Sequence, residues 1–154
     1  MIWLTGQCPS KALGVARQLD LLLSRRAYRT VLLDEAQLLG GLCEAASTKT
    51  GMRENERRLA YLAELFQRAG DAVIVCTGFR PSGWISLARW ILADWLFEVT
   101  LTDAGRETGA AVSREAGLAP LPKLSLVFDR TDLDPMTMAS VVATKAGIAL
   151  EMRD

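Results

Sequence analysis

The amino-acid sequence predicts a three-layer α/β/α domain built on a five-stranded, mainly parallel sheet. Short apolar runs without polar alternation recur along the 154 residues, as is typical of strands that are buried on both faces. Segments with apolar residues at helical spacing separate these runs, so strand and helix alternate along the chain. The expected strands are Ile2–Thr5, Thr30–Leu33, Ala72–Thr77, Phe97–Leu101 and Leu124–Phe128.

Length and composition predict one domain over residues 1–154. Half of the residues are hydrophobic, which is enough for one well-buried core and short for two. Eighteen basic residues balance eighteen acidic ones, so no overall field favours nucleic acid or an anionic membrane as a partner. The chain has no histidine, which removes the usual general base and the commonest metal ligand.

Cysteine usage and apolar run length predict the compartment. The three cysteines are odd in number and lack C-x-x-C spacing, so they indicate neither a disulfide framework nor a zinc site. A reducing cytoplasm is therefore expected. The apolar stretches are too short to span a bilayer, and the first residues lack the pattern of a cleavable leader, so neither membrane insertion nor secretion is expected.

Helical patterns fill the segments between the first three strands. Apolar residues recur at helical spacing over 13–23, so the first helix is expected to reach about residue 26. A weaker helical pattern over 36–46 precedes the polar turn STKTG. A strong helix is predicted over about 52–69, with Gly70 placed to cap its end.

The second half of the chain is less regular. The next helix is expected to carry Trp84, Leu87, Ala88, Ile91 and Leu92. A helix or helical loop is expected over 103–117. Asp134 is placed as the N-cap of a last helix, with Pro135 at its first position, and this helix is expected to end near Ala146.

The stretch after the first strand carries the main functional signal. Gly6 and a short polar turn lead into the first helix, an order in which backbone N–H groups can surround a phosphate. The P-loop pattern G-x-x-x-x-G-K-[ST] is incomplete, because no second glycine is present and no Ser or Thr follows Lys11. Gly6, Ser10 and Lys11 are the candidate nucleotide- or anion-binding residues. Lys11 is equally compatible with an ordinary solvated turn residue.

Two acidic residues end the second strand. Open α/β sheets bind ligands at the carboxyl ends of their strands, so Asp34 and Glu35 are candidate Mg²⁺ ligands. They are equally suited to cap the helix that follows.

Four segments together resemble the adenylylsulfate kinases. They are WLTG at the first strand, VLLD at the second, EN-x-RR-x-A-x-x-AELFQRAG on the long helix and AVIV at the third strand. The resemblance covers roughly residues 1–100. It implies a P-loop kinase fold, phosphorylation of adenylylsulfate at its 3′ position with ATP and Mg²⁺, and a homodimer.

The resemblance also shows where the loop departs from the family pattern. In the ungapped match, the family's second glycine falls on Lys11, its phosphate-binding lysine on Ala12 and its Mg-binding serine on Leu13. Lys11 is one residue early, and one residue is a rotation of about 100° on a helix. Pro9 also removes one N–H donor from the loop. A productive cradle for the β- and γ-phosphates is therefore not expected.

The acceptor side departs from the pattern as well. Asp34 keeps the place of the family's first aspartate and is the candidate base or metal organiser, with Glu35 as a displaced substitute. Asn55 and Arg58 match substrate-side residues and share one helix face, which suits either an anion or a structural hydrogen bond. Arg80 lies near the place of a missing substrate arginine. The family's lid has no counterpart after the fourth strand.

Three tryptophans on and after one helix suggest a contact surface. Trp84, Trp90 and Trp95 are suited to the core, because tryptophan is usually well buried. Tryptophans that are partly exposed would instead be good anchors for a protein partner.

The first hypothesis is therefore a degenerate adenylylsulfate kinase-like protein, noncatalytic or weakly binding a nucleotide or small anion, with a regulatory or protein-interaction role. The alternative is an active P-loop kinase that uses Lys11 for phosphate and Asp34 or Glu35 for Mg²⁺, acting on adenylylsulfate or another small hydroxyl acceptor.

Overall fold

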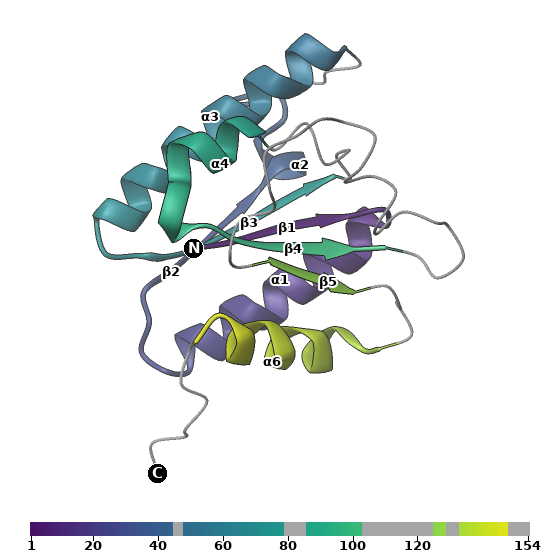
Figure 1. The fold of residues 1–154 in the computed structure, drawn as a ribbon, viewed down its shortest axis with the longest axis vertical. Helices are drawn as coiled ribbons and strands as arrows, with labels where there is room; N and C mark the ends of the chain where they lie inside the picture. The colour runs from purple at the N-terminus through teal and green to yellow at the C-terminus, as the bar shows by residue number, and fades with distance from the viewer. Residues whose placement is uncertain (45–47, 79–85, 103–124, 129–132, 148–154) are drawn as a thin grey trace.

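The chain forms the five-stranded sheet that its sequence predicts. The computed structural model describes residues 1–44, 48–78, 86–102, 125–128 and 133–147. Every pairing in the sheet is parallel, and the strand order is β2-β3-β1-β4-β5. The strands are β1 (Ile2–Gly6), β2 (Thr30–Asp34), β3 (Ala72–Gly78), β4 (Phe97–Leu101) and β5 (Ser125–Phe128), as Figure 1 shows.

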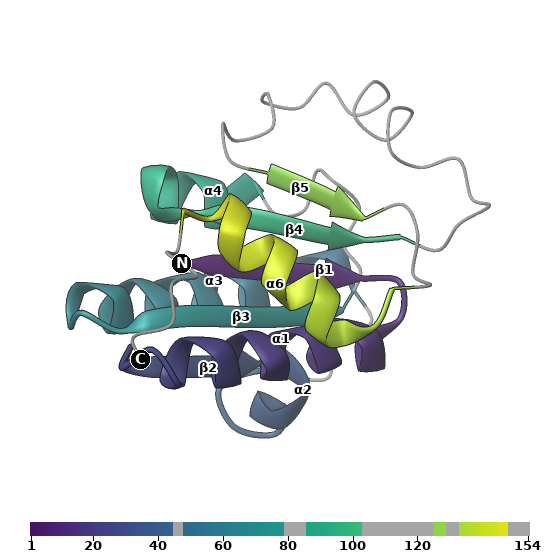
Figure 2. The same ribbon diagram turned by 90° about the horizontal axis from the view of Figure 1, so that it is seen from below.

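Helices cover both faces of this sheet (Figure 2). One face packs against α1 (Pro9–Ser24) and α6 (Pro135–Lys145), and the other packs against α3 (Lys49–Arg68) and α4 (Ser86–Leu92). A short α2 (Glu35–Leu38) follows β2, and a 3-10 turn, η1 (Ala93–Trp95), follows α4. The three-layer architecture expected from the alternation of patterns is confirmed.

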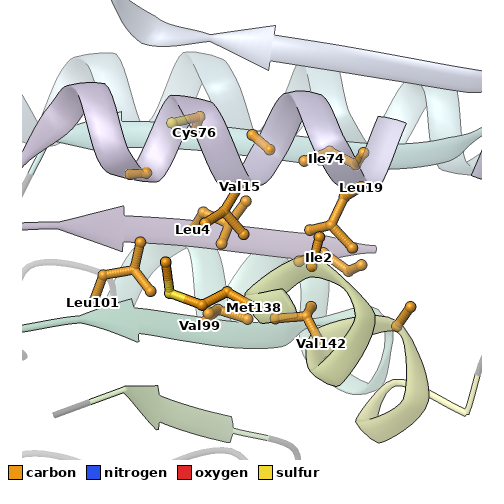
Figure 3. Close-up of a cluster of buried hydrophobic side chains, with 14 of the residues drawn as sticks. Ile2, Leu4, Val15, Leu19, Ile74, Cys76, Val99, Leu101, Met138 and Val142 are labelled. Atoms are coloured by element: carbon orange, nitrogen blue, oxygen red, sulfur yellow. The ribbon is translucent and has the colours of Figure 1, made fainter. Parts of the chain in front are cut away.

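The hydrophobic core has two parts because the central strands are buried on both faces. All five residues of β1 are buried, with Trp3 and Leu4 on opposite faces. The part between the sheet and the helices α1 and α6 is shown in Figure 3. It contains Ile2, Leu4, Val15, Leu19, Ile74, Val99, Met138 and Val142. Burying each of the larger side chains contributes about 1.5–3 kcal/mol.

Two predicted helix ends have the expected local structure. Gly70 has a φ of 89°, and the N–H groups of Gly70 and Asp71 donate to the carbonyls of Gln67 and Phe66 at 3.0 Å each. This Schellman motif ends α3 where the sequence predicts. Asp134 caps α6, because its side chain accepts from Met136 N–H and Thr137 N–H at 3.0 Å each.

The prediction of a helix over 36–46 is wrong in its length. Up to residue 44, where the described part of this range ends, only α2 forms, and it ends at Leu38. Gly40 adopts a φ of 83°, and the N–H of Cys43 returns to the carbonyl of Leu38 at 2.9 Å, so the chain turns instead of continuing the helix. The helical segment expected over 103–117 lies outside the described residues, as does Trp84.

Within the described residues, no helix combines the length and apolar character that a membrane crossing requires.

Candidate functional site

The candidate residues meet at the carboxyl edge of the sheet. Gly6 is level with Gly78 of β3 on one side and with Leu101 of β4 on the other. Asp34 is level with Cys76 across the β2–β3 pairing. The end of β1 and the end of β2 therefore lie at the same edge, separated only by β3. This is the edge where open parallel sheets hold their ligands.

The connection from β1 to α1 is short. Only Gln7 and Cys8 separate Gly6 from Pro9, the first residue of α1. The N–H groups of Lys11 and Ala12 both donate to the carbonyl of Cys8 at 3.1 Å, so they are directed into the helix. Proline at the first helical position favours this early start, because its fixed φ suits a helix and its missing N–H is not needed there.

The next two side chains of α1 pack toward the core. Ala12 is fully buried, and a Cβ built on Gly6 would lie 3.1 Å from the Cβ of Ala12. Leu13 packs against the core cluster of α1 and α6. The two positions that match a phosphate-binding lysine and a metal-binding serine are thus occupied by apolar side chains of the core.

Ser10 and Lys11 belong to the first turn of α1. Ser10 is exposed, and its hydroxyl lies 3.2 Å from the sulfur of Cys8. Lys11, the third residue of the helix, is half-buried. Together with Gly6, these residues form one continuous segment, as the sequence predicts. Their role in ligand binding stays a prediction.

Asp34 and Glu35 are buried where β2 ends. The Asp34 side chain accepts from the N–H of Ala36 at 3.1 Å and so caps α2. The Glu35 carboxylate accepts from the N–H of Gly78 at 3.4 Å, which ties the end of β2 to the end of β3. Burial, with smaller contributions from the two carboxylates, raises the pKa of the Cys76 thiol to about 12. No group of three or more candidate metal-binding side chains occurs within the described ranges.

Asn55 and Arg58 hold the chain between α2 and α3. The Asn55 amide donates to the carbonyl of Glu44 at 2.7 Å and accepts from its N–H at 3.1 Å. Arg58 donates to the carbonyl of Leu42 at 2.9 Å and to the Glu54 carboxylate at 3.0 Å. Both polar groups therefore contact the backbone of this connection. Their role in substrate binding stays a prediction. Arg80 lies outside the described residues.

Sequence reasoning missed two buried acidic residues that position α4. Glu56, on the buried side of α3, accepts from the N–H of Ala88 at 2.8 Å. Glu98, inside β4, forms a two-point ion pair with Arg89 at 2.5 and 2.8 Å. The available signal was the presence of these carboxylates at apolar positions of a helical or strand pattern, because buried charges require partners.

The fold and the glycine-ended first strand define a P-loop kinase-like α/β protein whose phosphate loop is altered. The family model for adenylylsulphate kinase matches residues 1–94. The chain therefore belongs to the adenylylsulfate kinase family.

Similar proteins share this assignment over part of their length. The chain is 36% identical over 80 residues to an adenylyl-sulfate kinase of Marinobacter nauticus, covering 51% of this chain and 39% of that protein. It is 38% identical over 78 residues to one of Pseudomonas aeruginosa, covering 50% and 40%. The matched region thus spans about two fifths of these relatives.

Solved structures confirm the fold. The Mycobacterium tuberculosis APS kinase CysC in complex with AMPPNP and APS has a TM-score of 0.70 and 24% identity, covering 95% of this chain and 96% of that chain. A hexameric APS kinase from Thiobacillus denitrificans has a TM-score of 0.70 and 18% identity, covering 95% and 28%. At these identities, the likeness concerns the fold alone.

Proposed function

We propose that this chain is a degenerate adenylylsulfate kinase-like protein that is noncatalytic, or binds a nucleotide or small anion only weakly, and acts through a regulatory or protein-interaction role. The observation that carries the proposal is the start of α1 at Pro9. The residues that would surround a phosphate are wound into the first helical turn, and their N–H groups at Lys11 and Ala12 are used within the helix.

ATP and Mg²⁺ are the groups that an active member would need, and the residues here do not fit them. Phosphoryl transfer relies on a lysine over the β- and γ-phosphates and on a hydroxyl that binds the metal. Ala12 and Leu13 occupy those positions and pack into the core. Asp34 is retained, but it caps α2. The residues present therefore do not support phosphoryl transfer by this chain.

One arrangement favours the alternative of an active kinase. Lys11 lies in the first turn of α1, which follows the end of β1, and Asp34 and Glu35 lie where β2 ends, at the same edge of the sheet. In that case, Lys11 would contact phosphate and an acidic residue would bind Mg²⁺, with adenylylsulfate or another small hydroxyl compound as acceptor. Turnover would then depend on Lys11.

A kinase assay separates the two candidates. The chain is incubated with ATP, Mg²⁺ and adenylylsulfate, and the adenylyl-sulfate kinase of Pseudomonas aeruginosa serves as the positive control. Lys11→Ala is compared with Lys145→Ala, a matched loss of an exposed lysine at the far end of α6. We expect no turnover above background for the wild type or for either variant. Turnover that is lost in Lys11→Ala and kept in Lys145→Ala would establish the active kinase instead.

A further inference from the structure

The outer face of α1 carries exposed side chains that neither the core nor the candidate site uses. Arg17, Leu21 and Arg25 follow one another at spacings of four residues, so they lie on one helix face, and all three are exposed. Arg25 is the C-cap residue and keeps helical backbone angles. These three residues are called the α1 stripe. Its two arginines lie about 12 Å apart along the helix axis, and Leu21, which is 40% exposed, stands between them.

The two cations of the α1 stripe are not engaged by the protein itself. Within the part of the chain that the structure describes, the guanidinium groups of Arg17 and Arg25 make no hydrogen bond or ion pair. The acidic residue of α1, Asp20, accepts instead from the hydroxyl of Thr30 at 2.5 Å. Both guanidinium groups are therefore available to a carboxylate from another molecule.

The helical layer around the α1 stripe has an excess of positive charge. Apart from Asp20, neither α1 nor α6 contains an acidic residue, and Asp134 is engaged as the N-cap of α6. Lys145 adds an exposed cation at the end of α6. In the opposite layer, Arg68 of α3 is instead paired with Glu64 at 2.8 Å. The α1 face is thus complementary to an acidic surface.

The spacing within the α1 stripe favours a helix as the acidic partner. Rows of side chains four residues apart form the ridges that interdigitate in the commonest class of helix packing. A nucleic acid would gain phosphate contacts from only two arginines of the stripe, and its affinity depends on the number of such contacts. An anionic membrane would require a larger apolar face than one leucine provides.

We propose that the α1 stripe docks an acidic amphipathic helix of a protein partner, in which two carboxylates eight residues apart flank an apolar side chain. Arg17 and Arg25 each pair with one carboxylate, and Leu21 packs against the apolar side chain between them. This inference names a partner for the protein-interaction role proposed above, and it rests on that role.

The first test is an NMR titration of the isotope-labelled full chain with an alanine-rich helical peptide of about 20 residues. The peptide carries glutamate, leucine and glutamate four residues apart, and a matched peptide carries lysine in place of both glutamates. We expect amide shifts along α1 with the acidic peptide, at a dissociation constant below about 1 mM that rises with salt. The lysine peptide should not bind.

Charge reversal tests the two ion pairs. Arg17→Glu and Arg25→Glu should each raise the dissociation constant of the acidic peptide about tenfold, because each replaces an attraction by a repulsion. Arg53→Glu is the matched control, since Arg53 is an exposed arginine of α3 in the opposite layer, and it should leave the constant unchanged. The double variant Arg17→Glu with Arg25→Glu should bind the lysine peptide instead, which a misfolded variant would not do.

Four results would overturn the proposal. They are no binding of the acidic peptide at millimolar concentration, binding that Arg17→Glu and Arg25→Glu leave unchanged, a double variant that does not bind the lysine peptide, and tighter binding of a short DNA duplex or an anionic phospholipid vesicle through the same arginines. Turnover in the kinase assay would remove the proposed protein-interaction role without altering the peptide titration, so the two failures are distinguishable.

Discussion

Restoring the family's lysine at position 12 should destabilise the chain rather than restore phosphate binding. Ala12 is fully buried and faces Gly6 across a gap that a single added Cβ would reduce to 3.1 Å. A longer side chain placed there costs about 1–3 kcal/mol through overpacking. Burial lowers the pKa of a lysine by about 3–5 units, and this shift adds roughly 4 kcal/mol to the loss of folding stability at pH 7. Ala12→Lys should therefore lower the free energy of unfolding by about 5–7 kcal/mol.

The assay is equilibrium unfolding in urea, with Ala12→Met as the matched control of similar length and no charge. Ala12→Met should lose only the packing part, about 1–3 kcal/mol. The difference between the two variants has a defined pH dependence. The folded pKa of the new lysine lies below its unfolded value, so the extra loss is present at pH 7 and disappears as pH rises past about 10.4.

One result would refute this reasoning. If Ala12→Lys is as stable as Ala12→Met at pH 7 and gains Mg-dependent ATP binding, then the side chain at position 12 reaches an open loop. The description of the first turn of α1 as a filled phosphate site would then be wrong.

Three further predictions concern stability. Arg89→Met leaves the buried Glu98 carboxylate without its ion pair and should cost about 3–5 kcal/mol in urea unfolding. Gly70→Ala puts a Cβ on a residue with a φ of 89° and should lower stability by about 1–2 kcal/mol. Gly41→Ala is the control, because Gly41 lies in a loop and has no positive φ, and it should lower stability less. The pKa of the buried Cys76 thiol is about 12, so the folded state keeps a proton that the unfolded state loses above about 9. Stability should therefore fall between about pH 9 and 12, and Cys76→Ser should reduce that fall in urea unfolding.

The sequence predicts the fold well because local patterns and tertiary packing agree. The uninterrupted apolar runs of β1 and β3 are buried on both faces, and Gly70 and Asp134 end or begin their helices by local hydrogen bonds. These features depend on residues close together in the chain. The short α2 was not predicted, because the turn at Gly40 depends on a positive φ that a helical apolar pattern does not reveal.

The candidate site could be predicted only as a set of positions. Sequence matching assigns Gly6, Asp34 and Asn55 to the family pattern, but it does not predict the atoms that Asp34 and Asn55 contact. The early start of α1 depends on Pro9 at its first position and on the Cys8 carbonyl, which accepts from the N–H groups of Lys11 and Ala12. The motif comparison showed only that the loop was incomplete. The Arg89–Glu98 pair joins α4 to β4, and no spacing rule predicts such a contact.

The most direct test of the filled phosphate site is calorimetric titration of the wild-type chain with ATP, with and without Mg²⁺. If the first turn of α1 occupies the cradle, any dissociation constant should be about 1 mM or weaker, equivalent to roughly 4 kcal/mol of binding free energy, and Mg²⁺ should not change it. Mg-dependent binding at micromolar concentration, roughly 8 kcal/mol, would contradict the account.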